Sequence, residues 1–248
     1  MNIFKKLIGN IEKSIKNIEK NKIQKTNGEK MSEQAASEAK KFSYRQEVKR
    51  KLLHMTSFVF VIFIYLTTKQ TACLVIGFLF VALVAAEQLC RMFPALNNIK
   101  IRFFSSVLRE NEKSGNVSSV WFLLGCFLSV LLFSKEVAMI GITILIFGDA
   151  FAALIGKRFG KHKFKNGKSL EGTLGFIGVS IIFLIAYFFI LDLTMSFTLM
   201  AAVSIIAASI VEIYTKQLKL DDNLTIPLTF GFSMWILTWI FGIAAAMI

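Results

Sequence analysis

Proline and cysteine are scarce in this chain of 248 residues, which contains two prolines and three cysteines. The cysteines, Cys73, Cys90 and Cys126, form no CxxC pair and show no metal-ligand spacing, which argues against a structural zinc site or a disulfide framework. We interpret them as small apolar packing residues. Acidic residues are also few, with 16 Asp and Glu against 29 Lys and Arg and a net charge of +13.

Hydrophobic residues, in contrast, make up 55% of the sequence, and 25 of them are phenylalanine. A water-soluble core cannot bury so much apolar surface. The apolar runs approach the ~20 residues that a helix needs to cross a bilayer, and they are too long and continuous for barrel strands. The sequence therefore predicts an all-α, multi-pass transmembrane helix bundle with about seven spans. The predicted spans are 52–68, 71–90, 119–134, 136–156, 172–191, 196–213 and 225–247.

The basic residues are unevenly distributed between the segments that connect these spans. All of them except Lys69 and Lys135 lie before the first span or in the segments 91–118, 157–170 and 214–224. With seven spans, these four regions share one face, which the positive-inside rule makes cytoplasmic. We therefore interpret the net charge as a signal of membrane orientation and expect no nucleic-acid partner.

The N-terminal region differs from the rest of the chain. Between residues 1 and 18, apolar residues recur at helical spacing with Lys and Glu between them, which predicts an amphipathic helix on an anionic membrane surface. A solvated charged tail remains an alternative interpretation. We divide the chain into a basic tail and linker, 1–44, and a membrane-embedded domain, 45–248.

A carboxylate inside a membrane span is expected to have a charged partner or a functional role, because each costs roughly 2.5–3.5 kcal/mol to insert. Asp149 lies about 12 Å up the predicted fourth span, counted at 1.5 Å per residue, beside a small-residue stripe of Gly148, Ala152 and Gly156. We expect it to face the bundle interior and to serve function. Glu87 is expected to snorkel or to pair with Arg91 rather than to take part in catalysis. The other carboxylates predicted at cytoplasmic ends are Glu171, Glu212, Asp221 and Asp222.

The loop between the fourth and fifth spans reads GKRFGKHKFKNGKSLEG over 156–172, with four glycines and six cations. Glycines let backbone N–H groups approach phosphates. The NGKS stretch is not a P-loop, because His162 stands where that motif needs glycine. Ser169 and Glu171 also suit the start of a helix. Asp221, Asp222 and Asn223 predict either a turn or a metal or general-base site.

Three stretches together resemble the polyprenol and diacylglycerol kinase family that uses CTP. They are EVKRKLLH (47–54), GDAFAALIGKRFGKHKFKNGKSLEGT (148–173) and DDNLTIPL (221–228). The resemblance implies an all-helical membrane enzyme that moves the γ-phosphoryl of CTP onto a lipid hydroxyl. Phosphatidate cytidylyltransferases have a similar core but end in a different motif. The residues carried over are Arg50, Lys51, His54, Gly148, Asp149, Gly156, Gly160, Lys168, Ser169, Glu171, Gly172, Asp221, Asp222 and Asn223.

The resemblance and the charge pattern give a hypothesis for each role. Magnesium ligands are expected at Asp149, Glu171 and Asp222, a phosphate-neutralising cation at Lys168, and the base at Asp221 or Asp222. The acceptor is a polyprenol, phytol or diacylglycerol in a bacterial inner membrane or endoplasmic reticulum, with the site facing the cytoplasm. A CDP-lipid-forming enzyme and a transporter or scaffold are alternatives. The expected nucleotide-binding residues are Lys51, Gly156, Arg158, Gly160, Lys168, Ser169, Gly172 and Asn223, and further candidates are Arg50, His54 and Glu212.

Overall fold

A computed structural model describes residues 44–104, 118–218 and 220–241. Residues 46–248 form one compact unit, apart from Met1–Arg45. The predicted amphipathic helix near the N-terminus and the last part of the predicted seventh span lie outside the described residues. Within the described ranges the chain is helical and forms no strand, apart from an isolated antiparallel bridge between Lys163 and Ser169.

Five helices are long and apolar enough to cross a membrane, counted over the part of the chain that the structure describes. They are α3 (Lys69–Met92), the continuous helix Lys135–Phe159, α8 (Leu170–Ile190), Met195–Thr215 within α9 (Met195–Leu218), and α10 (Asp222–Ile240). The prediction of an all-α membrane bundle is confirmed. The number of spans and the side on which each end lies remain predictions.

The first predicted span is interrupted by a turn in the structure, and the third is slightly shorter than predicted. Residues 46–56 are helical, a turn follows at Ser57, and α2 (Phe58–Leu66) continues from there. The third span appears as α5 (Ser118–Leu132), an apolar helix of 15 residues. The basic segment after α3 contains a helix that the sequence did not predict, α4 (Pro94–Phe104).

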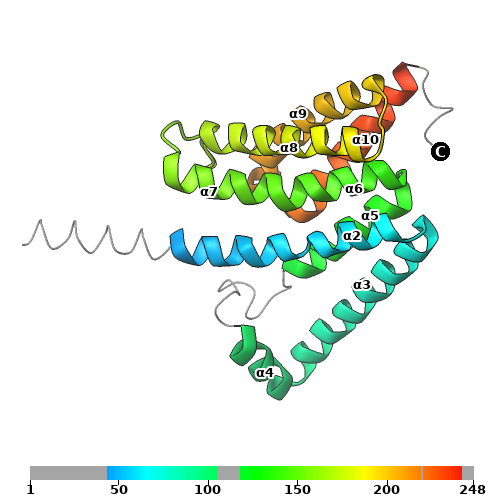
Figure 1. Ribbon diagram of the computed structural model, residues 1–248. Coiled ribbons are helices and arrows are strands. Elements are labelled where there is room, and N and C mark those ends of the chain that lie inside the picture. Colours follow the sequence, from blue (N-terminus) through cyan, green and yellow to red (C-terminus); the bar gives the residue numbers. More distant parts are fainter. Residues whose placement is uncertain (1–43, 105–117, 219, 242–248) are drawn as a thin grey trace, which may run out of the picture. The chain divides into compact units, whose positions relative to one another are not determined.

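The helix Lys135–Phe159 lies among the other helices of the bundle. It consists of α6 (Lys135–Thr143), the π-helical η2 (Ile144–Gly148) and α7 (Asp149–Phe159), and 72% of its apolar window is buried. Figure 1 shows α6 and α7 running along α8, with which α7 makes extensive contact. Large apolar side chains such as Ile142, Leu145 and Ile146 are fully buried. Asp149 therefore lies on a helix that faces protein on most sides.

Small residues bring α7 and α8 close together. A Cβ atom added to Gly172 would lie 2.7 Å from the Ala152 carbonyl oxygen and 3.3 Å from the Gly156 Cα. A Cβ at Gly148 would lie 2.9 Å from the Phe176 ring. The small-residue stripe before the basic loop thus packs against α8, as its spacing predicts.

Candidate functional site

A buried ion pair joins the helical segment 46–56 to the start of α7. The ammonium group of Lys51 contacts Oδ2 of Asp149 directly, and the two side chains are only 4% and 9% exposed. Asp149 directly follows the five residues of the π-helical η2. Such wide turns occur inside α-helices mostly as local interruptions, often at functional sites. The carboxylate predicted to face the bundle interior does so, with a lysine as its partner.

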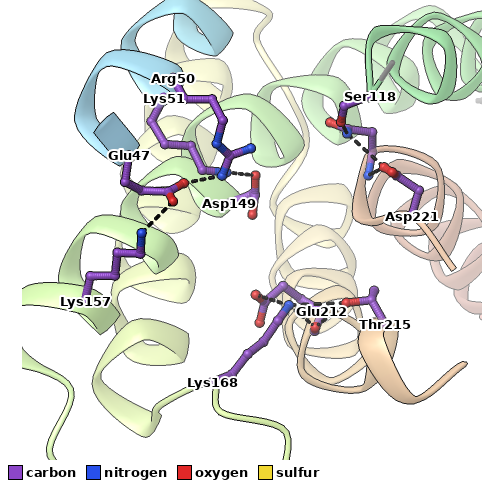
Figure 2. A network of polar contacts seen from close by, with 11 residues as sticks. Glu47, Arg50, Lys51, Ser118, Asp149, Lys157, Lys168, Glu212, Thr215 and Asp221 are labelled. Carbon is purple, nitrogen blue, oxygen red and sulfur yellow. Dashed lines mark hydrogen bonds and ion pairs between the residues drawn. The ribbon is translucent and has the colours of Figure 1, made fainter. Parts of the chain in front are cut away.

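A second ion-pair group lies beside the first. Glu47, one helical turn before Lys51, accepts a hydrogen bond from Lys157 Nζ at 2.8 Å and pairs with Arg50. Burial raises the pKa of Glu47, but the hydrogen bonds and positive charges of Lys157 and Arg50 outweigh that effect and hold this pKa below its ordinary value. The segment 46–56 is thus attached to α7 at two points, and Figure 2 shows both.

Lys168 attaches the basic loop to the end of α9 that is predicted to face the cytoplasm. Its Nζ contacts both the side-chain carboxylate and the backbone carbonyl of Glu212, and it donates to Thr215 Oγ1 at 3.2 Å. Asn166 of the same loop donates to the carbonyl of Ile213. Glu212 and Thr215 are buried. The loop is therefore fixed by a cation and an amide to one turn of a neighbouring helix.

The third polar group forms around the start of α10. Asp221 caps this helix through Oδ1, which accepts from the Asn223 backbone N at 2.9 Å and from its Nδ2 at 2.8 Å. The Asn223 amide also donates to Ser118 Oγ of α5 at 2.7 Å. A Cβ at Gly125 would collide with the Asn223 carbonyl, so glycine is required for this close approach of α5 and α10. Asp222 and Asn223 thus begin a helix that Asp221 caps, and the metal or general-base role of this group stays a prediction.

Asp222 lies near several of these groups. Its carboxylate interacts electrostatically with Asp149, Lys51 and Lys168. Glu212 likewise feels the charges of Lys168, Asp149 and Lys51. The segment 46–56, α7, the basic loop, α9 and the start of α10 thus bring charged side chains to one end of the bundle. Figure 2 shows this region with labels on Lys51, Asp149, Lys168, Glu212 and Asp221. Their catalytic roles remain predictions.

Other predicted site residues have different surroundings. The Glu171 carboxylate accepts bonds from the His162 backbone N and from its Nδ1, the latter at 2.8 Å. Ser169 caps α8 through Gly172 N, as predicted for a helix start, and a Cβ at Gly156 or Gly160 would crowd its hydroxyl. Arg158 is exposed, and its guanidinium lies 5.2 Å from the centre of the Phe159 ring.

A magnesium ion is predicted at Asp149, Glu171 and Asp222. Among the side chains that the structure describes, no group of three or more His, Cys, Asp or Glu residues is arranged to hold a metal. Mg²⁺ commonly binds through one or two carboxylates together with substrate phosphates and water. Asp149 and Asp222, whose charges interact, would supply two such carboxylates, and a magnesium site there stays a prediction. Glu171 is instead engaged by His162.

Sequence reasoning missed several residues of this network, among them Glu47, Thr215 and Ser118. Glu47 stands four residues before Lys51, so helical spacing alone places both on one face. Thr215 follows Glu212 by three residues in the same way. Ser118 and Asn223 are 105 residues apart in the sequence, and no local sequence pattern predicts the hydrogen bond between them.

Comparison with known proteins identifies several relatives. An uncharacterized protein of Rickettsia prowazekii is 34% identical over 202 residues, which is 78% of this chain and 96% of that protein. A phytol kinase of Synechocystis is 35% identical over 47% of this chain and 50% of that kinase. A CTP-dependent diacylglycerol kinase of Schizosaccharomyces pombe is 25% identical over 54% of this chain and 63% of that kinase. The chain thus matches between half and two thirds of these two kinases.

Neither a protein-family profile nor a solved structure matches the chain.

Proposed function

Because the chain belongs to the family of CTP-dependent polyprenol and lipid kinases, we propose that it transfers the γ-phosphoryl group of CTP to the hydroxyl of a membrane lipid alcohol. The observation that carries this proposal is the grouping of two lysine–carboxylate pairs and Asp222 at one end of the bundle. Phosphoryl transfer depends mainly on positioning and on neutralising charge, and this set of residues supplies both.

The two lysines are the proposed phosphate-binding cations. Lys51 contacts the carboxylate of Asp149, and Lys168 contacts that of Glu212. Incoming phosphates compete with those carboxylates for the ammonium groups. A lysine that is paired with a carboxylate already has a fixed orientation. When a phosphate takes the place of that carboxylate, the freed carboxylate can coordinate a metal ion or accept a proton. Lys51 is buried, so its interaction with a phosphate is screened little by solvent.

Asp149 and Asp222 are the proposed ligands of Mg²⁺, together with oxygens of the nucleotide. A bound magnesium ion would neutralise charge on the phosphates during transfer. We keep Glu171 as a weaker candidate, because its oxygens bond to His162.

Asp222 is also the proposed acceptor of the proton from the lipid hydroxyl. Oδ1 of its neighbour Asp221 accepts two hydrogen bonds from Asn223 and caps α10. Because Asp221 serves as the helix cap, Asp222 is the better candidate of the two for the base. The lipid alcohol would approach the site laterally from the bilayer.

The site is proposed to face the cytoplasm. The basic loop that carries Lys168 and the basic segment before Lys51 both belong to the face that the positive-inside rule makes cytoplasmic. CTP is available on that side of a bacterial inner membrane or of the endoplasmic reticulum.

A labelling experiment tests the proposed function. Purified protein is incubated with Mg²⁺ and with γ-labelled or α-labelled CTP, in micelles that contain a polyprenol, phytol, diacylglycerol or phosphatidate. We expect label in the lipid only from γ-labelled CTP and only with an alcohol. Transfer of the α label to phosphatidate would instead identify a cytidylyltransferase. Absence of both transfers would contradict an enzymatic role, and unlabelled ATP and GTP as competitors test the choice of donor.

A further inference from the structure

One nitrogen of the His54 ring is buried and has no hydrogen-bond partner. His54 lies in the helical segment 46–56, and Nε2 is one of two buried side-chain polar atoms without a partner in the described ranges, the other being Ser180 Oγ. The ring itself is held in place. It packs edge-on against Phe122, with ring centres 5.5 Å apart.

Buried polar atoms in proteins nearly always have a partner, so each exception calls for an explanation. Here the ring packs against Phe122, and no hydrogen bond satisfies its buried nitrogen. In a neutral imidazole one ring nitrogen carries the proton and the other presents a lone pair. With the proton on Nδ1, Nε2 is suited to accept a hydrogen bond from a molecule that enters the site.

The position of His54 indicates which molecule that is. Along the segment from residue 47, the contacts change from the ion pairs of Glu47 and Lys51 to the aromatic contact of Phe58 with Phe147, whose ring centres lie 5.3 Å apart. His54 stands between them, and its ring feels the charges of Asp149 and Lys51. It thus lies where the charged cluster meets apolar side chains, which is the boundary that the head of a lipid alcohol must reach.

Resting on the proposed function, we infer that His54 Nε2 accepts a hydrogen bond from the hydroxyl of the lipid alcohol and so holds it beside the Lys51–Asp149 pair. In the bound alcohol the hydroxyl proton is directed to the imidazole. For transfer the hydroxyl turns this proton to Asp222, the proposed base, and its oxygen attacks the phosphoryl group. This contact requires an acceptor lipid with a free hydroxyl group. An ether or ester of the same lipid lacks the donor and does not make the contact.

Two replacements separate the two ring nitrogens. In the His54→Asn variant the amide reaches only as far as Nδ1, whereas in His54→Gln it reaches the position of Nε2. Each variant and the unaltered protein are purified in a detergent without hydroxyl groups. Thermal unfolding is then measured with phytol, a polyprenol or 1,2-dioleoylglycerol, and with the methyl ether of each.

We expect at least one alcohol to raise the unfolding temperature of the unaltered protein more than its methyl ether does. His54→Gln keeps most of this difference and His54→Asn loses it. An equal effect of alcohol and ether on the unaltered protein would overturn the inference, and Nε2 would then serve internal water only. The same conclusion follows if His54→Asn keeps the difference.

Kinetics give a second readout that a purely structural role would not produce. The KM for the lipid alcohol should rise about fivefold to tenfold in His54→Asn, as expected for one hydrogen bond between neutral groups, while the KM for CTP stays unchanged. Equal losses for both substrates would overturn the inference. Alcohol binding without any transfer of label by the unaltered protein would contradict the proposed function and leave this inference standing.

Discussion

The ammonium group of Lys51 lies buried against the carboxylate of Asp149, which is 98 residues further along the chain. Burying two opposite charges seldom adds stability, because the cost of removing both from water offsets their attraction. A pair of apolar side chains would hold the segment 46–56 against α7 at least as well. The pair is therefore better explained by the chemistry of the site than by folding, and its replacement tests this explanation.

Replacing one member of the pair should damage both stability and activity. Asp149→Asn leaves Lys51 buried without its counter-charge, and we expect a loss of about 3–5 kcal/mol in the free energy of unfolding together with loss of label transfer from γ-labelled CTP. The double variant Lys51→Met, Asp149→Leu should recover most of the stability and none of the activity. Unfolding in detergent and the labelling assay check both. Activity in Asp149→Asn would remove this residue from the mechanism.

Lys168 should govern binding of the nucleotide. Lys168→Met removes a cation that contacts Glu212 and Thr215, and we expect the KM for CTP to rise about tenfold or more, as for the loss of one charged hydrogen bond. Lys165→Met is the matched control, since Lys165 lies in the same loop, carries the same charge and is exposed. Similar values of KM for the two variants would show that the loop acts only through its total charge.

Close packing of α7 and α8 should depend on the position of each glycine. Gly172→Ala places a methyl group 2.7 Å from the Ala152 carbonyl oxygen, so we expect a destabilisation of about 1–3 kcal/mol. Gly178, on the same helix, has nothing within 4 Å of an added Cβ. Gly178→Ala should therefore be neutral or stabilising by up to about 1 kcal/mol. Thermal unfolding of both variants compares them, and equal destabilisation would contradict the described packing.

The contribution of Glu47 should depend on pH. Since the pKa of its folded-state carboxyl is lowered by Lys157 and Arg50, Glu47 stabilises the fold above its unfolded-state pKa of about 4.3 and loses this effect as pH falls through the folded value. Lys157 is 41% exposed, so Glu47→Gln should cost only about 0.2–1 kcal/mol at pH 7. Unfolding measured from pH 7 to pH 3 should show the two proteins converging. A constant difference would exclude an ionic role.

Sequence reasoning predicted the fold class and part of the network for physical reasons. Long apolar runs require a closed backbone in lipid, so an all-α bundle followed directly. The position of Asp149 deep in such a run indicated an interior side chain. Helical spacing also placed the cap at Ser169 and the small-residue stripe against α8.

The remaining features depend on contacts between distant parts of the chain. Nothing near Lys168 indicates that its partner is Glu212, 44 residues away. The spacing of Arg158 and Lys157 did not reveal that Lys157 turns to Glu47 while Arg158 stays exposed. The π-helical turn before Asp149 was also missed, since Ile144, Leu145 and Ile146 suit an ordinary α-helix equally well.

The order of Lys51 and Asp149 along the chain has a consequence for biogenesis. Ribosomes synthesise the lysine first, so a cation is already present in the chain when the aspartate is made. The acidic helix can then meet its counter-charge soon after it is made, which shortens the time during which a bare carboxylate faces lipid tails. Exchanging the two residues would reverse this order, leaving the bound pair unchanged in composition but exposing the nascent helix before its partner exists.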